Sequence, residues 1–176
     1  MLRADFQNRC AYCLTHEFYN GGEANFEIDH FRPWRGPHAR PDLKSTYANL
    51  YWSCSECNSN KGDKWPDAIQ YESGYRFVDP CEEWGDHDLH WIFDRDGTLT
   101  AITRAGEYTE DKLMLWREML QHHRAQYFRD QDELREIEHI LMQAIDNPSR
   151  TELLRRLADI RARLQPPVYD RPRRAT

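Results

Sequence analysis

The sequence has no long hydrophobic run. Its mean hydropathy is −0.94 over 176 residues, and a membrane-spanning helix needs about 20 consecutive, mostly apolar residues. The N-terminus also lacks the apolar core of a secretory signal. We therefore expect a protein of the cytoplasm that does not engage a membrane.

An excess of positive charge is missing as well. The chain has 24 Lys and Arg against 30 Asp and Glu, a net charge of −6, which argues against unspecific binding of nucleic acid by the whole surface. Residues 32–64 differ from the rest, with six Lys or Arg against three Asp or Glu. The sequence therefore predicts a local basic patch.

Cysteine is scarce outside two short pairs. Four of the five cysteines form two C-x2-C motifs, Cys10–Cys13 and Cys54–Cys57. Each such motif presents two thiolates from one turn, and two motifs complete a tetrahedral zinc site. The 40 residues between the motifs, 14–53, exceed the roughly 15–20 of a simple zinc ribbon. We expect a structural zinc ion that holds a functional insert, and we interpret Cys81 as an ordinary thiol.

The insert and the second motif contain polar side chains suited to catalysis. Asp29 could bind a hard cation and His30 could take a proton from water, because Pro33 indicates that a strand ends there. Asn58 could add an amide oxygen, and Lys61, three residues on, could neutralise a phosphate. Taken singly, each is more typical of an ordinary surface residue than of a catalytic site. Their position in and between the cysteine motifs favours a catalytic site.

Together these residues resemble the HNH endonuclease superfamily, the ββα-metal nucleases, in its four-cysteine form. The matching positions within residues 1–66 are Cys10, Cys13, Asp29, His30, Asn49, Cys54, Cys57, Asn58 and Lys61.

This resemblance implies a role for each residue. His30 would be the general base, Asp29 and Asn58 would be ligands of a catalytic Mg²⁺ or Mn²⁺, and Asn49 would brace the loop after the histidine by backbone hydrogen bonds. The four cysteines would bind structural Zn²⁺. One departure is Asn58, which stands where the last letter of the family name expects histidine and which bears on metal preference more than on activity.

A wider resemblance rests on the stretches Asp-His-Phe-Arg-Pro at 29–33 and Cys-Asn-Ser-Asn-Lys-Gly at 57–62. These stretches are similar to those of small HNH proteins of bacterial anti-phage systems, in particular the nuclease subunit of Septu-type systems. The resemblance implies a role in defence or restriction and a partner protein, for example an ATPase.

Phosphodiester hydrolysis requires a water, a base and positive charge on the phosphate, which these residues supply. We therefore expect a DNA endonuclease. The predicted phosphate contacts are Arg32, Arg35, Arg40, Lys44 and Lys61. The alternative is a non-catalytic, zinc-containing adaptor that binds nucleic acid or protein. Such an adaptor needs the cysteines but not Asp29, His30, Asn49 and Asn58.

The predicted fold class is α+β: a zinc-stapled ββα-metal core with a β-hairpin extension and a C-terminal helical hairpin. The expected divisions are a core at 1–66, a β-rich extension at 67–108, the helical hairpin at 109–165 and a basic tail at 166–176. Apolar positions at helical spacing suggest that the hairpin binds a partner protein or a second copy.

Local signals refine this picture. The turn signal at 20–22 predicts a hairpin whose second strand carries Asp29 and His30, and Asp96-Gly97 predicts a hairpin of 89–94 with 98–103. Ser53 is the expected cap of a helix from about Cys54 to Lys64.

Further signals lie in the C-terminal half. Residues 75–78 are expected to form a strand. Thr109 is expected to cap a long helix that Asn147-Pro148 ends, and Ser149 to open the next. The tryptophans Trp84, Trp91 and Trp116 are expected in the core.

Overall fold

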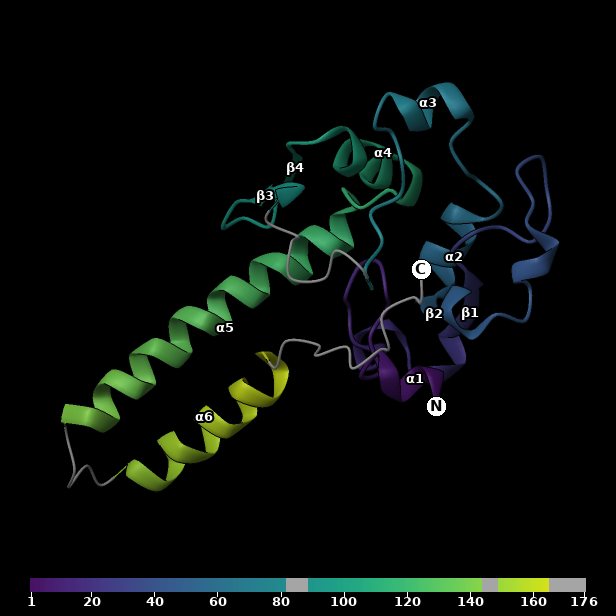
Figure 1. Ribbon diagram of the computed structural model, residues 1–176. Coiled ribbons are helices and arrows are strands. Elements are labelled where there is room, and N and C mark those ends of the chain that lie inside the picture. The colour runs from purple at the N-terminus through teal and green to yellow at the C-terminus, as the bar shows by residue number, and fades with distance from the viewer. Residues whose placement is uncertain (82–88, 144–148, 165–176) are drawn as a thin grey trace.

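The computed structural model of the protein describes residues 1–81, 89–143 and 149–164 (Figure 1). After a short helix α1 (Leu2–Asp5), strand β1 (Phe26–His30) pairs antiparallel with β2 (Leu50–Cys54), and helix α2 (Ser55–Lys61) follows directly. Phe26 lies opposite Cys54 and His30 opposite Leu50. One end of this short ladder therefore carries a zinc-motif cysteine, and the other carries the histidine.

The prediction of a hairpin around residues 20–22 is wrong, because the described residues 1–19 form no strand before the turn. The chain instead forms two 3₁₀ helices, Glu17–Asn20 and Glu23–Asn25. The His16 ring accepts a hydrogen bond from the Phe18 backbone N–H, and Gly21 ends the first of these helices with φ +80°. The turn signal is genuine, but the partner of β1 is β2, across a loop that contains the 3₁₀ helices Pro41–Leu43 and Tyr47–Asn49.

Helix α2 begins one residue later than predicted and ends earlier. Its N-cap is Cys54, whose sulfur accepts a hydrogen bond from the Cys57 backbone N–H at 3.5 Å, while Ser53 is buried within β2. Gly62, at φ +52°, ends the helix before Lys64. The cysteine therefore both caps the helix and belongs to the metal motif.

The predicted hairpin extension is confirmed. After helix α3 (Ala68–Glu72), strands β3 (Trp91–Phe93) and β4 (Leu99–Ala101) pair antiparallel. Gly97 in their turn has φ +86°, and a Cβ there would lie 1.9 Å from the Gln121 carbonyl oxygen. Glycine is required because this turn packs directly on the backbone of a later helix.

Two predictions in this region are wrong for one shared reason. Helix α4 (Arg104–Leu113) is capped by Thr103, whose hydroxyl accepts from the Gly106 N–H at 3.0 Å. Thr109 is buried inside the helix, where its hydroxyl accepts from the Val78 backbone N–H at 2.8 Å. That side chain takes the place of a strand partner, and residues 75–78 form no strand.

The C-terminal helical hairpin is confirmed in outline. Helix α4 ends at Met114, which has a left-handed φ of +53°, and α5 (Glu118–Gln143) and α6 (Arg150–Leu164) follow. Figure 1 shows α5 running away from the ββα unit and α6 lying along its outer part. Because of the break at 114–117, Trp116 is 55% exposed rather than in the core, whereas Trp91 is buried as predicted.

The hydrophobic core is divided in two. The larger cluster contains the aromatic residues of the ββα unit together with Trp91, Tyr108, Leu113 and Leu120. A smaller cluster between α5 and α6 is formed by Ile137, Leu157, Ile160 and Leu164. The start of α5 thus belongs to the main core, whereas its outer part packs only on α6.

Some sequence predictions lie outside the described residues: Trp84, the Asn147-Pro148 break and the tail at 166–176. Within the described ranges, no helix is long and apolar enough to cross a membrane.

Arg117 connects the two halves of the molecule. Its guanidinium donates to the Leu113 carbonyl at 2.6 Å and to the Cys57 sulfur at 3.5 Å, and it forms an ion pair with Glu56 at 2.9 Å. The side chain is 9% exposed. One buried cation therefore holds α2 against the junction of α4 and α5.

Arg117→Met should destabilise the protein by about 2–3 kcal/mol, because hydrogen bonds to a charged group are lost in a buried place. For a chain of this length the melting temperature should fall by roughly 5–10 °C. The control is Arg155→Met, which removes an exposed ion pair with Glu152 and should leave the melting temperature unchanged. Equal melting of the Arg117→Met variant and the wild type would contradict this role.

Candidate functional site

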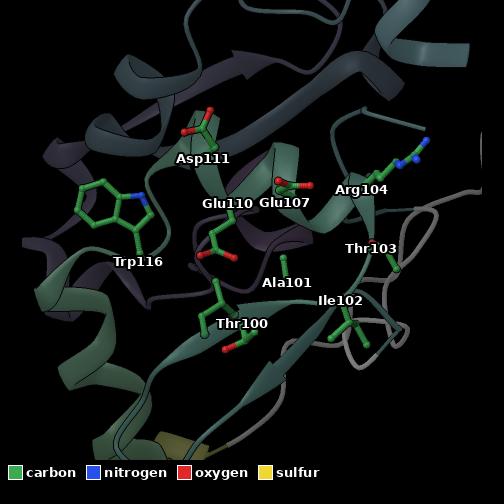
Figure 2. Close-up of a pocket in the computed structure, with 10 residues that line it drawn as sticks. Thr100, Ala101, Ile102, Thr103, Arg104, Glu107, Glu110, Asp111 and Trp116 are labelled. Atoms are coloured by element: carbon green, nitrogen blue, oxygen red, sulfur yellow. The ribbon is translucent and has the colours of Figure 1, made fainter. Parts of the chain in front are cut away.

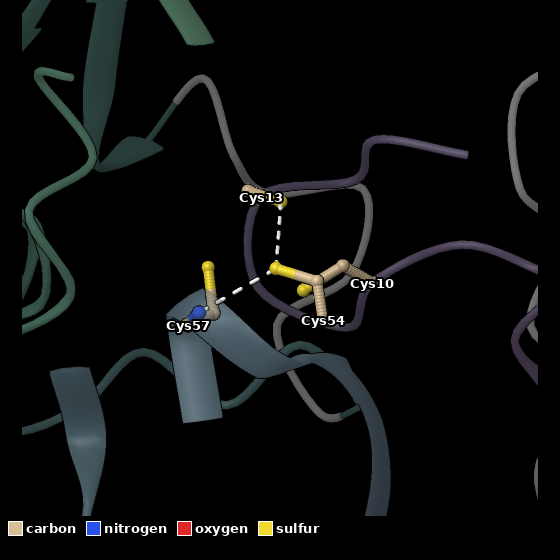
Figure 3. Close-up of side chains that lie close together, drawn as sticks. All are labelled: Cys10, Cys13, Cys54 and Cys57. Atoms are coloured by element: carbon tan, nitrogen blue, oxygen red, sulfur yellow. Dashed lines mark hydrogen bonds between the residues drawn. The ribbon is translucent and has the colours of Figure 1, made fainter. Parts of the chain in front are cut away.

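The four motif cysteines converge on one point. Cys10 and Cys13 lie in the loop after α1, Cys54 at the end of β2 and Cys57 in α2, and their sulfurs all lie within 4.8 Å of one another (Figure 3). Zn–S bonds of about 2.3 Å in a tetrahedron place sulfurs about 3.8 Å apart, and the Cys13 and Cys54 sulfurs are 3.9 Å apart. The donor set and its spacing fit a structural zinc ion.

The charges around this cluster also fit a thiolate centre. Burial raises the pKa of the Cys10 thiol, but hydrogen bonds from the other three thiols outweigh it, and the pKa lies well below its ordinary value. The hydrogen bonds with Cys10 in turn raise the pKa values of Cys13 and Cys57 well above theirs, so the negative charge is centred on Cys10. Burial likewise opposes the charge of Arg117, yet the Cys57 thiolate and Glu56 raise its pKa above the usual value. Arg117 therefore offsets part of the negative charge of four thiolates. No motif in the sequence pointed to it.

Asp29 and Lys61 form a buried ion pair beneath the strand. The Lys61 ammonium lies 3.0 and 3.2 Å from the two Asp29 oxygens and donates to the His30 carbonyl at 2.7 Å. Tyr12, inside the first cysteine motif, also donates to the Asp29 carboxylate. Burial, then the Asp29 charge, raise the pKa of Tyr12 well above its ordinary value, so its hydroxyl stays protonated and remains a donor.

Burial gives Lys61 a role other than the predicted one. Its side chain is 0% exposed, and burial lowers its pKa while Asp29 partly counteracts this. In this arrangement the ammonium is fully buried and pairs with Asp29, whereas the predicted phosphate contact requires an exposed cation. Lys61 instead ties the Asp29 carboxylate to the backbone of His30 and fixes the end of β1.

His30 lies at the end of the β1–β2 ladder that is farther from Cys54. Its Nε2 lies 2.9 Å from the Lys44 carbonyl oxygen. Because a carbonyl can only accept, Nε2 carries the proton, and in the neutral ring Nδ1 keeps its lone pair. The loop after β1 thus selects the tautomer that a general base at Nδ1 requires.

Asn49 makes the backbone contacts predicted for it. Its side-chain oxygen accepts from the Arg32 N–H at 2.8 Å, and its amide donates to the Arg32 and Leu43 carbonyls at 3.0 and 3.3 Å. The residue is buried. It closes the loop between the strands at its base, and the Lys44 carbonyl is held close to His30 as a result.

The predicted ligands of a catalytic ion are both engaged elsewhere. The Asn58 amide donates to the Glu27 carboxylate, and Asp29 is paired with Lys61. Carboxylate and amide oxygens suit Mg²⁺ or Mn²⁺ chemically, but an ion could reach Asp29 only by displacing the Lys61 ammonium. Glu27 precedes Ile28 on β1 and is the partner of Asn58. It was not identified from the sequence as a candidate site residue, because nothing in the motif distinguishes it.

The other predicted phosphate contacts fall into two groups. Arg32 lies over the Trp65 ring at 4.3 Å, and Arg40 pairs with Asp42 at 2.7 Å. Arg35 and Lys44 are exposed and lie over the Trp34 ring, at 5.7 and 4.2 Å from its centre. Arg35 and Lys44 are therefore the cations best placed beside His30.

A cavity of about 640 Å³ lies elsewhere, between β4 and α4 (Figure 2). Glu107, Glu110 and Asp111 line one side and Trp116 another, and Ile102 also lines it. None of the predicted site residues lines this cavity. We do not assign the functional site to this cavity on its size. Its lining residues do not bring a general base together with groups that would bind a nucleophile.

A short antiparallel pair, the helix that follows it, a four-cysteine cluster and a histidine at the strand end together form a ββα unit, the arrangement that the HNH resemblance implies. Comparison with known protein families agrees, since residues 10–64 match the family model described as HNH endonuclease. The resemblance predicted from the motif is thereby confirmed, as is the α+β fold class.

Among curated proteins, the chain is similar to the Septu protein PtuA of Bacillus mycoides (strain KBAB4). The two are 26% identical over 155 residues, which cover 73% of this chain and 20% of the relative. The chain thus spans about one fifth of the length of that relative. No solved structure matches the chain.

Cys54→Ser should release the zinc ion and unfold the ββα unit, because the thiolate is both ligand and helix cap and structural zinc contributes folding free energy directly. Cys81→Ser is the matched control, since Cys81 lies outside the cluster. Zinc content and thermal melts report the result. A Cys54→Ser protein with full zinc and an unchanged melt would refute the zinc assignment.

Proposed function

We propose that the chain is a metal-dependent HNH endonuclease that hydrolyses phosphodiester bonds in DNA. The proposal is carried by the hydrogen bond of 2.9 Å between His30 Nε2 and the Lys44 carbonyl, which leaves Nδ1 to accept a proton. The match of residues 10–64 to the HNH endonuclease model supports the same activity.

In this proposal the residues divide the work. His30 Nδ1 takes a proton from water while the water oxygen bonds to phosphorus and the bond to the leaving oxygen breaks on the opposite side. Arg35 and Lys44 contact neighbouring phosphates. Lys61 holds the His30 carbonyl, and Asn49 holds the backbone of Arg32 in the loop that follows. No described side chain resembles a base-reading element, so these contacts favour recognition of the backbone.

Mg²⁺ or Mn²⁺ is the proposed catalytic ion. When bound, such an ion supplies positive charge to the scissile phosphate and the leaving oxygen. Asp29 and Asn58 remain the proposed ligands, with the exposed Glu27 carboxylate beside Asn58. The ion pair of Asp29 with Lys61 makes binding of this ion a competition between two cations.

The biological setting is proposed on the similarity to a Septu protein. It supports a role in anti-phage defence or restriction in the cytoplasm, together with a partner protein such as an ATPase. The helical hairpin of α5 and α6 is the proposed surface for that partner or for a second copy, since its outer part packs away from the main core.

A non-catalytic adaptor is the second candidate, and the Asp29–Lys61 pair is the observation that favours it. A carboxylate already neutralised by a buried ammonium has no need of a metal ion. An adaptor of this kind would keep the zinc cluster and would bind DNA or protein without cutting.

His30→Ala distinguishes the two candidates. Loss of the general base should lower the single-turnover rate of DNA cleavage by about 100-fold or more, while zinc content and melting temperature stay at wild-type values. His122→Ala, an exposed histidine on α5, is the control and should cut normally. Cleavage by His30→Ala at the wild-type rate would exclude His30 as the base.

Lys61→Met tests the competition between cations at Asp29. An uncompensated buried carboxylate costs about 3–5 kcal/mol, so the variant should melt well below the wild type without divalent ions. Because Mn²⁺ can then neutralise Asp29, saturating Mn²⁺ should raise the melting temperature of Lys61→Met more than that of the wild type. The double variant with Asp29→Asn should lose this gain. Equal Mn²⁺ shifts in all three proteins would argue against Asp29 as a ligand.

A further inference from the structure

Trp34 occupies a place that the nuclease chemistry above does not use. Its ring centre lies 6.1 Å from that of His30, and the Lys44 ammonium lies 4.2 Å from the Trp34 ring centre. Lys44 also supplies the carbonyl that orients His30. Indole, imidazole and ammonium therefore form one group at the open end of β1.

The ring is not part of the hydrophobic core. Trp52 stacks on Phe26 and Trp91 is buried, whereas Trp34 is half-buried in the loop after β1 and belongs to neither described core cluster. Its ring lies against the His30 ring and beneath the cations Lys44 and Arg35. A large aromatic side chain is thus kept at the surface beside the candidate base.

The cations over the ring can be exchanged for a nucleobase. Both Lys44 and Arg35 are exposed, and an exposed cation–π contact is worth only about two- to fivefold in an equilibrium constant. A base stacked on an aromatic side chain contributes about 5- to 150-fold in affinity. The two contacts together are worth about 4- to 25-fold, so a base in the upper part of the stacking range outweighs both. The displaced cations can then pair with phosphates of the same strand.

From this arrangement we infer that Trp34 is a stacking platform for an unpaired base next to the cleaved phosphodiester, so that the substrate is a strand with unpaired nucleotides rather than continuous duplex. The inference rests on the proposed nuclease function for the position of the scissile phosphate. In a continuous duplex each base is covered on both faces by its neighbours, whereas an unpaired or extruded base can lie flat on an indole.

Binding measurements test this without cleavage. The His30→Ala protein is titrated with a fluorescent 12-nucleotide single strand that carries 2-aminopurine at its centre, with the same sequence as duplex, and with the single strand as RNA. Trp34→Leu in this background should weaken binding of the single strands by about 5- to 150-fold and leave duplex affinity within about twofold. Trp116→Leu removes an exposed tryptophan outside the site and should change neither affinity.

Two further readings guard against misfolding. Trp34→Phe keeps a stacking ring and should retain most of the single-strand affinity. The 2-aminopurine fluorescence should be quenched by the Trp34 protein and not by Trp34→Leu, with equal zinc content in all variants. Loss of the same size for single strand and duplex, or no loss for either, would overturn the inference while leaving the cleavage test of His30 to decide the nuclease function.

Discussion

The convergence of four thiolates on one point is the constraint on which the rest of the structure depends. The short ladder of β1 and β2 has five residue pairs, and α2 has seven residues, too few for independent stability. The cysteine cluster joins the loop after α1 to the corner between β2 and α2, and Arg117 carries that attachment on to α4 and α5. The cysteine cluster therefore adds to the stability that the aromatic core of the ββα unit provides.

The other end of the same ladder is held by a buried ion pair and not by the cysteine cluster. The buried Lys61 ammonium joins the Asp29 carboxylate to the His30 carbonyl, and Asn49 holds the loop that returns the Lys44 carbonyl to the imidazole. The histidine is thus fixed through its backbone and its ring by different elements. Such preorganisation suits the general-base role proposed for His30, because proton transfer by a base depends on geometry before pKa.

The features that could be predicted from the sequence are those that a short local motif specifies. Each of these predictions rests on residues that are close together in the sequence. They are the two C-x2-C motifs, His30 before a proline, Asn49 before β2, and Asp96-Gly97 in the turn of the second hairpin. The burial of Lys61 could not be predicted, because it depends on which face of α2 packs on β1 across 32 positions in sequence. The exchanged roles of Thr103 and Thr109, and the break at Met114, likewise follow from packing that helical periodicity does not encode.

The central claim is that the zinc cluster holds the strand that presents His30. Amide hydrogen exchange with and without a strong zinc chelator tests it most directly. The account predicts that removal of zinc abolishes protection in β1, β2 and α2 together, while the outer part of α5 and α6 keeps its protection because Ile137, Leu157 and Ile160 form a separate core. Protection of β1 and β2 that is unchanged after complete removal of zinc would contradict the account.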